Sequence, residues 1–141
     1  PGSKMSKSGE SPQGILRLLD EPSVTAKKLK SAVTDNDREI RFDQAEKPGV
    51  SNLLTILSVI TGEGIPSLVA GFEGKGYGDL KGAVADAVVA EFAPVRERAL
   101  ELLADPAELD RLLTANADRA AEIADATLRR VYAAVGFLPR V

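Results

Sequence analysis

The sequence predicts an all-α protein, a helical bundle of about five or six helices. Apolar residues recur at steps of three and four over long stretches, which is the period of one helix face. Prolines and acidic or hydroxyl residues stand where helices should begin, and glycines stand where they should end. Aromatic residues make up only 4% of the 141, so the core must be built from Leu, Val, Ile and Ala. The length fits one domain, or one domain and a fragment of another.

The first ten residues are small and polar and have no apolar period, so we expect them to form a loop. A short helix should follow them. Ser11 is a suitable N-cap, because its hydroxyl can accept a bond from a free backbone N–H, and Pro12 fits the first helical position. The triplet at 20–22 should end this helix, whose apolar side consists of Ile15, Leu16, Leu18 and Leu19.

Residues 23–33 (SVTAKKLKSAV) predict a second helix that carries three lysines. Its inward side should hold Leu29, with Ala32 and Val33 near its end. A solvated face is the expected role of such a run of charges. Contact with a polyanion is the functional alternative for the lysines, which are Lys27, Lys28 and Lys30.

A long polar connection is expected at 34–49, and loops of this length in compact domains are often functional or disordered. Ile40 and Phe42 flank Arg41, so a short extended piece is possible there. The spacing of the carboxylates does not match an EF-hand loop. Ordinary solvation of a loop is the interpretation for these carboxylates, which are Asp35, Asp37, Glu39 and Asp43.

The most apolar segment, 50–61 (VSNLLTILSVIT), is too long for a typical strand and suits a buried helix. Ser51 is the expected N-cap and Gly62 the expected stop. The many β-branched residues keep a strand as the minority alternative. A short helix is expected at 65–74, followed by a Gly-rich connection at 74–80.

From Gly78 onward the helical period is strong through Leu103, with Pro94 inside it. A proline there removes a backbone hydrogen bond and is expected to kink or divide the helix. A last long helix should begin at Asp105, with Asp105 as N-cap and Glu108 placed for a capping box. Gly136 should end it.

The composition excludes several classes of site. There is no Cys and no His, so this chain has no Cys nucleophile, no Ser-His-Asp triad and no Cys/His zinc site. The absence of disulfides is consistent with a reducing cytosol. No apolar run is long enough to span a bilayer, and no signal peptide is visible.

The net charge of −3 is unevenly spread. Residues 1–47 carry nine Lys or Arg against eight Asp or Glu, a net of +1. Residues 48–141 carry nine against thirteen, a net of −4. Nucleic-acid-binding proteins usually have a strongly basic face. Any contact with nucleic acid in this chain should therefore be local.

The string GKGYG at 74–78 invites a phosphate-binding interpretation. However, neither the P-loop pattern nor the dinucleotide-binding pattern of glycines is present. A tight turn that leads into a helix is the favoured interpretation, with glycines supplying unusual backbone angles.

The string KMSKS at 4–8 has a clear chemical logic. Two ammonium groups on flexible stems can follow a triphosphate and stabilise the charge that develops on leaving pyrophosphate. Serines add hydrogen-bond donors and keep a loop able to open and close. By composition alone, a disordered polar end is the preferred interpretation.

KMSKS is the second signature of class I aminoacyl-tRNA synthetases, and here it is complete. The segments SPQGILRLLDEPSVTAKKLKSAVTD, EIRFDQAEKPGVSNLLTILSVITG, GKGYGDLK and ADPAELDRLL…ATLRRVYAAVGFLP resemble the bacterial tryptophanyl-tRNA synthetases. The resemblance runs from Lys4 to about Pro139. Tyrosyl-tRNA synthetases share a KMSKS-type loop but not this continuation.

The resemblance implies a two-step reaction. Tryptophan and Mg·ATP give tryptophanyl-adenylate and pyrophosphate, and the tryptophanyl group then passes to tRNA(Trp). The implied catalytic residues are Lys4 and Lys7, with Lys7 the first candidate for stabilising charge in the transition state. The implied ATP-binding loop consists of Lys4, Met5, Ser6, Lys7 and Ser8.

The resemblance also implies a division of the chain, with 1–10 a KMSKS remnant of the catalytic domain and 11–141 the helical domain that recognises the tRNA anticodon. The catalytic Rossmann domain, with its HIGH motif, is expected upstream. The isolated chain should therefore be inactive, while the whole enzyme should be a cytoplasmic homodimer. The alternatives are a free-standing helical RNA-binding module and a helical module for protein association.

Overall fold

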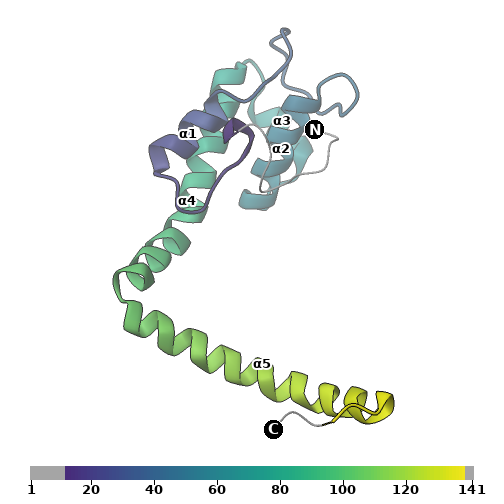
Figure 1. Ribbon diagram of the computed structural model, residues 1–141. Helices are drawn as coiled ribbons and strands as arrows, with labels where there is room; N and C mark the ends of the chain where they lie inside the picture. Colours follow the sequence, from purple (N-terminus) through teal and green to yellow (C-terminus); the bar gives the residue numbers. More distant parts are fainter. Residues whose placement is uncertain (1–11, 139–141) are drawn as a thin grey trace. The chain divides into compact units, whose positions relative to one another are not determined.

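The computed structural model describes residues 12–138, and these residues form helices and connections with no strand among them. The element order is η1 (Pro12–Gly14), α1 (Pro22–Lys30), α2 (Pro48–Thr61), α3 (Ile65–Gly71), α4 (Tyr77–Ala104) and α5 (Pro106–Val135) (Figure 1). The prediction of an all-α chain is confirmed. The extended piece expected around Ile40 forms no strand.

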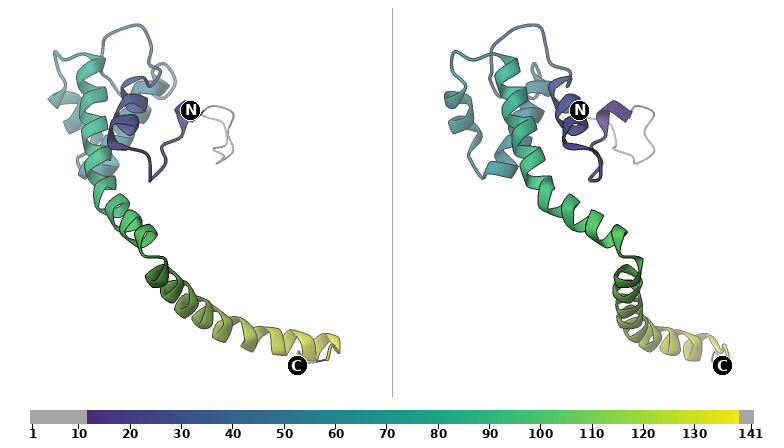
Figure 2. Two further views of the ribbon diagram at one scale, coloured as in Figure 1. Left: turned by 60° about the vertical axis from the view of Figure 1, so that its left-hand side comes forward. Right: turned by 90° about the vertical axis from the view of Figure 1, so that its left-hand side faces the viewer.

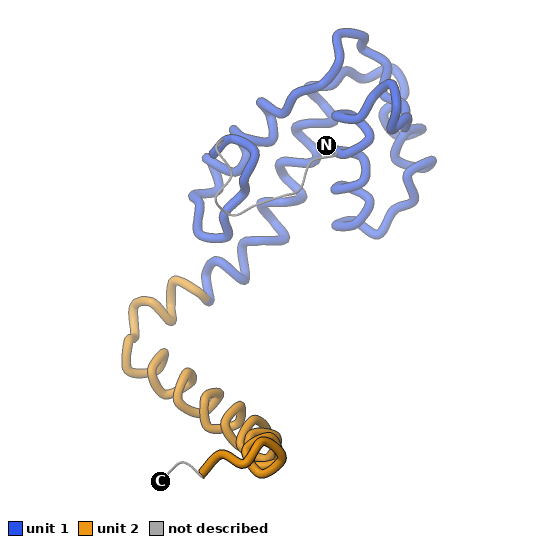
Figure 3. The backbone as a smooth tube through the Cα atoms, turned by 45° about the vertical axis from the view of Figure 1, so that its right-hand side comes forward, with its two compact units in different colours: residues 1–98 blue, residues 99–141 orange. Residues whose placement is uncertain are grey.

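The chain divides into two compact units, residues 1–98 and 99–141 (Figure 3). Helix α4 is continuous across this boundary, so Pro94 does not divide it.

The first unit is built around an aliphatic core to which α1, α2, α3 and α4 all contribute. Figures 1 and 2 show the N-terminal half of α4 between α1 on one side and the pair α2 and α3 on the other. Leu54, Val84 and Leu80 are completely buried. The remaining buried apolar residues are Leu29, Ile40, Val50, Leu53, Leu57, Leu68, Ala85 and Val88.

Two helix starts differ from the sequence prediction. Helix α2 begins at Pro48 rather than after Ser51, and its N-cap is Lys47. The hydroxyl of Ser51 is used elsewhere, because it accepts a bond from the backbone N–H of Asp43 at 2.8 Å. Helix α1 begins at Pro22 and ends at Lys30, three residues before the predicted end.

The helix predicted after Pro12 is reduced to the single 3-10 turn η1. The backbone carbonyl oxygen of Ile15 instead accepts a bond from the amine of Lys28 at 2.8 Å. The side chain of Lys28 in α1 thus satisfies the hydrogen-bonding requirement of this carbonyl group, which a further helical turn would otherwise satisfy.

The second unit consists of the last turns of α4, helix α5 and the residues after it. The predicted cap of α5 is confirmed, because Asp105 Oδ1 accepts a bond from the N–H of Glu108 at 3.1 Å. Gly136 ends the helix in the left-handed conformation at φ +74°, as predicted. No residue of α5 is buried, and its apolar side chains, such as Ile123 with 69% exposure, lie open within this unit.

Candidate functional site

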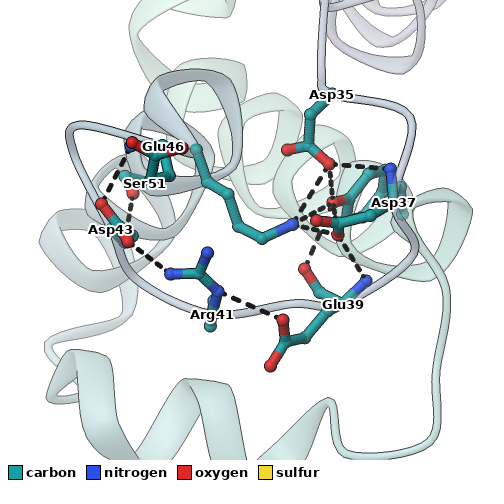
Figure 4. Close-up of polar contacts among 9 residues, drawn as sticks. Asp35, Asp37, Glu39, Arg41, Asp43, Glu46 and Ser51 are labelled. Carbon is teal, nitrogen blue, oxygen red and sulfur yellow. Dashed lines mark hydrogen bonds and ion pairs between the residues drawn. The ribbon is translucent and has the colours of Figure 1, made fainter.

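A buried amine, that of Lys47, joins the connection at 34–47 to the start of α4. The side chain of Lys47 is only 1% exposed. Its Nζ donates to Asp35 Oδ1 at 3.1 Å and to the hydroxyl of Tyr77 at 2.9 Å, and it also pairs with the carboxylate of Asp37. Figure 4 shows Asp35 and Asp37 facing each other across this cluster. A buried cation is therefore compensated by two carboxylates.

The hydroxyl of Tyr77 extends the same cluster. It contacts the carboxylate of Asp35, lies 3.0 Å from Asp37 Oδ1 and lies 3.2 Å from the carbonyl oxygen of Glu39. The amine of Lys47 is 5.6 Å from the centroid of its ring, within the range of a cation–π contact. Tyr77 is the first residue of α4, so the cluster fastens the beginning of that helix to residues 35–39.

The electrostatics of the cluster favour its charged carboxylates and its neutral phenol. Hydrogen bonding from Lys47 lowers the pKa of Asp37 to about 2, and hydrogen bonding from Tyr77 lowers the pKa of Asp35. Burial, followed by the hydrogen bond to Asp35, raises the pKa of Tyr77 to about 12. Burial alone would lower the pKa of Lys47, but its bonds to Asp37, Tyr77 and Asp35 outweigh burial and raise it.

A second polar group lies on the same connection (Figure 4). Arg41 Nε donates to Glu39 Oε2 at 3.1 Å, and its Nη1 pairs with Asp43. Asp43 also accepts bonds from the backbone N–H groups of Ala45 at 3.1 Å and Glu46 at 2.9 Å. The backbone N–H of Glu46 is the largest cause of the lowered pKa of Asp43, followed by Arg41. These contacts fold the connection into a defined turn before α2.

The interpretation of the loop carboxylates as merely solvated is therefore wrong for Asp35, Asp37 and Asp43. Their partners come from within the connection and from Tyr77, 42 positions after Asp35. One signal in the sequence was available: Lys47 directly precedes the proline that begins the most apolar helix. A lysine at such a junction needs a carboxylate partner if its amine is buried.

A groove of about 710 Å³ opens beside these clusters. Two chain segments line it. The first is the part of the connection at 38–41, and the second runs from α3 into the glycine-rich loop. The lining residues are Arg38, Glu39, Ile40, Arg41, Pro66, Val69, Ala70, Phe72, Glu73, Gly74, Lys75 and Gly76.

The glycine-rich string forms the turn that its sequence predicts. Gly74 has a φ of +75°, and the N–H of Gly76 donates to Asp79 Oδ2 at 2.9 Å just before α4 begins.

The lysines of α1 divide into two kinds. The Nζ of Lys28 forms an ion pair with Asp20 Oδ2 at 2.6 Å, whereas the side chains of Lys27 and Lys30 are exposed.

The residues predicted to form the ATP-binding loop, Lys4, Met5, Ser6, Lys7 and Ser8, lie outside the described residues. Within 12–138, no group of three or more acidic side chains is arranged to hold a metal ion.

Comparison with known proteins decides the family. The model of the tRNA synthetases class I (W and Y) matches residues 1–93 of the chain. The chain belongs to this family of class I tRNA synthetases. The match covers the KMSKS string and continues through most of the first unit.

Individual relatives of this synthetase family agree. The chain is 56% identical over 138 residues to the tryptophan–tRNA ligase of Corynebacterium efficiens and 55% identical over 138 residues to that of Leifsonia xyli. Each match covers 98% of this chain. The tryptophanyl-tRNA synthetase of Mycoplasma pneumoniae has a similar structure, with a TM-score of 0.80, 31% identity and coverage of 95% of this chain.

The chain spans only part of these synthetases: 40% of the relative from Corynebacterium efficiens and 41% of the one from Leifsonia xyli. The chain likewise covers 41% of the Mycoplasma pneumoniae synthetase.

Among the described residues, no single helix has the length and apolarity to cross a membrane. Helices α2 and α3 meet these criteria only when taken together, and they are bent by 108° at the break between them.

Proposed function

We propose that this chain is part of a tryptophan–tRNA ligase, an enzyme that activates tryptophan with ATP and transfers it to tRNA(Trp). The observation that carries the proposal is the 56% identity to a ligase of that name over nearly the whole chain, together with a complete KMSKS string. Tryptophan rather than tyrosine is favoured, because the relatives from Corynebacterium efficiens and Leifsonia xyli are both named for tryptophan.

In this proposal, residues 1–10 contribute one side of the ATP site. The amines of Lys4 and Lys7 contact the triphosphate of Mg·ATP, with Met5, Ser6 and Ser8 completing the loop. Negative charge moves onto the leaving pyrophosphate as the tryptophan carboxylate attacks the α-phosphate. An ammonium group that stabilises this developing charge in the transition state more strongly than it stabilises bound ATP lowers the free-energy barrier of the step.

Residues 11–141 form the helical domain that recognises the anticodon of tRNA(Trp). A binding domain of this kind needs a rigid framework, and the aliphatic core shared by α1 to α4 supplies one. The remainder of the reaction, including the tryptophan pocket and the HIGH motif, belongs to a Rossmann domain outside these 141 residues of the ligase. We further propose that the complete ligase is a homodimer and acts in the cytoplasm, where translation takes place.

The proposal is tested by tryptophan-dependent exchange between ATP and pyrophosphate. The full-length ligase should catalyse exchange with tryptophan and not with tyrosine, and the 141-residue chain alone should be silent. Robust exchange by the chain alone would contradict the proposed division of the active site. Strong, salt-dependent binding of tRNA by the chain alone would favour a free-standing RNA-binding module instead.

A further inference from the structure

The segment that follows the KMSKS string is held in place by side chains from two helices. Residues 15–21 form neither a helix nor a strand, and the last residue of the string, Ser8, is only seven positions before Ile15. Seven residues span at most about 25 Å even when they are fully extended. The position of this segment therefore limits where the string can lie.

The first anchor of the segment is Lys28 of α1, whose side chain is only 12% exposed. Its Nζ donates to the carbonyl oxygen of Ile15 at 2.8 Å and to Asp20 Oδ2 at 2.6 Å. The hydrogen bond from Lys28 is the largest cause of the lowered pKa of Asp20. A single amine thus binds both ends of residues 15–20, and it does so where little water competes for the ion pair.

The second anchor is Arg96 of α4, which is also largely buried. Its Nε donates to the carbonyl oxygen of Asp20 at 3.1 Å, and its Nη2 pairs with the carboxylate of Glu21. The hollow that remains between this part of the chain and α4 has a volume of about 20 Å³, which is room for no more than one water molecule. The end of the segment therefore packs closely on α4.

Both anchors belong to one compact body. Helices α1 and α4 share the aliphatic core of the first unit, to which they contribute Leu29 and Val84 among other residues. Leu16, from the segment itself, packs against the same core. The segment has no backbone ladder to hold it, so these side-chain contacts determine its place on a rigid framework.

We propose that Lys28 and Arg96 are positioning residues for the KMSKS lysines. They fix the segment through which the string joins the helical unit, and they thereby set how accurately Lys7 meets the triphosphate. Neither residue contacts ATP in this account, because each acts through residues 15–21. The inference rests on the proposed function and deepens it.

The expected consequence is a loss of rate rather than of tryptophan binding. A group that stabilises a transition state must be held within about 0.5 Å of its productive position, so a small shift of the string should slow the step in which charge develops. The tryptophan pocket belongs to the Rossmann domain of the proposed ligase. Its affinity for tryptophan should therefore change little when the segment moves.

The test measures single-turnover formation of tryptophanyl-adenylate, and the Kd for tryptophan, in the full-length ligase. Lys28→Met removes the ammonium group and keeps an apolar side chain, and it should slow adenylate formation about tenfold while the Kd changes less than twofold. Lys27→Met is the matched control, because Lys27 is an exposed lysine of the same helix. It should change the rate less than twofold, and equal losses in both variants would overturn the inference.

The second anchor is tested by substitutions on a different helix. Arg96→Met removes the contacts with Asp20 and Glu21 while leaving Lys28 in place, and it should slow the same step by a similar factor. Arg96→Lys keeps the charge without the planar fork and should recover part of the rate. This pair of variants also tests the inference if Lys28→Met does not fold. A wild-type rate in Arg96→Met would contradict it.

A general loss of stability is distinguished by Gly49→Ala. A Cβ at Gly49 would meet the backbone of Val33 and Thr34 rather than residues 15–21. This variant should lower Tm, yet at temperatures where it remains folded it should form adenylate within twofold of the wild-type rate. If Gly49→Ala slows adenylate formation as much as Lys28→Met does, the anchors have no specific role and the inference is wrong.

A double-mutant cycle with Lys7 decides whether the anchor acts through the string. In a Lys7→Ala background, the tenfold effect of Lys28→Met should shrink to less than threefold, because the group being positioned is already absent. An undiminished tenfold effect would show that the two residues act independently and would overturn the inference.

The same cycle separates the two possible failures. If Lys7→Ala itself leaves the rate unchanged, the ATP-loop part of the proposed function fails, and the inference fails with it. If Lys7→Ala slows adenylate formation while Lys28→Met and Arg96→Met do not, the proposed function stands and the inference alone is wrong.

Discussion

The amine of Lys47 lies 2.9 Å from the hydroxyl of Tyr77, although the two residues are 30 positions apart in the sequence. One directly precedes α2 and the other begins α4. Because Asp35 and Asp37 contact both groups, a single cluster joins the connection, the start of α2 and the start of α4. We expect the stability of the first unit to depend on this cluster.

Replacing Lys47 should be more damaging than removing the hydroxyl of Tyr77. Lys47→Met leaves Asp35 and Asp37 close together with no cation between them, whereas Tyr77→Phe keeps the ion pairs. At pH 7, thermal unfolding should show a larger fall in Tm for Lys47→Met than for Tyr77→Phe. The difference should shrink at pH 3, where protonation relieves the repulsion. An equal fall for both variants at pH 7 would refute this role of the amine.

Gly49 is required by a close approach of backbone to backbone. A Cβ at this position would lie 2.3 Å from the carbonyl oxygen of Val33 and 3.3 Å from the Cα of Thr34. Gly49→Ala should therefore destabilise the chain by about 1–3 kcal/mol in urea unfolding. Gly82→Ala is the matched control, because a Cβ at Gly82, inside α4, meets nothing within 4 Å. It should be stabilising by about 0.5–1 kcal/mol, and a similar loss in both variants would argue against the steric account.

Acid should weaken the first unit through the carboxylates of the cluster. Lys47 lowers the pKa of Asp37 from 3.8 to about 2, so the folded state binds this proton less readily than the unfolded state. The stabilisation is thus fully present above about pH 4 and is lost as the pH falls through about 2. The Tm of the wild type should fall over this range. Asp37→Asn should be less stable at pH 7 and show a shallower fall, and a steeper one would contradict the assignment.

The phenol of Tyr77 should ionise only at high pH. Burial and the hydrogen bond to Asp35 raise its pKa from 10.0 to about 12, which favours the neutral phenol of the folded state. This contribution to stability is present below pH 10 and is lost as the pH rises through about 12. In a Tyr132→Phe variant, Tyr77 is the only tyrosine, and the chain has no Trp. Ultraviolet titration of tyrosinate should then give a midpoint near 12, whereas a midpoint near 10 would show that the hydroxyl is not held as described.

Local signals in the sequence predicted most of the helices. The N-cap of α5 is where the sequence predicts it, because Asp105 accepts a bond from the N–H of Glu108. The ends of α2 and α5 are also as predicted, since Gly62 and Gly136 adopt the left-handed conformation there. Such caps depend on only a few neighbouring residues. The predicted start of α2 lies too late in the sequence, because Ser51 satisfies the usual preference for an N-cap while the helix begins at Pro48. In the structure its hydroxyl binds Asp43, eight positions earlier. Such tertiary use of a hydroxyl cannot be read from the helix itself.

The polar clusters depend on contacts between distant positions, and the sequence did not predict them. Nothing near Asp35 indicates that its partner is Tyr77, which is 42 positions away. The glycine-rich string was correctly predicted as a turn, yet its Lys75 lines a groove with Arg38 only because the fold brings two loops together. For the KMSKS string, the local composition predicts only a disordered polar end. The resemblance to the synthetase family is what predicts a function for it.

The central claim is that this chain supplies the charged loop of an ATP site, and single-turnover kinetics of the full-length ligase test it most directly. Formation of tryptophanyl-adenylate should be about a hundredfold or more slower in Lys7→Ala than in the wild type, while the Kd for tryptophan changes little. The lysine would then act mainly in the transition state. An unchanged rate of adenylate formation, or equal losses in rate and in tryptophan affinity, would contradict the claim.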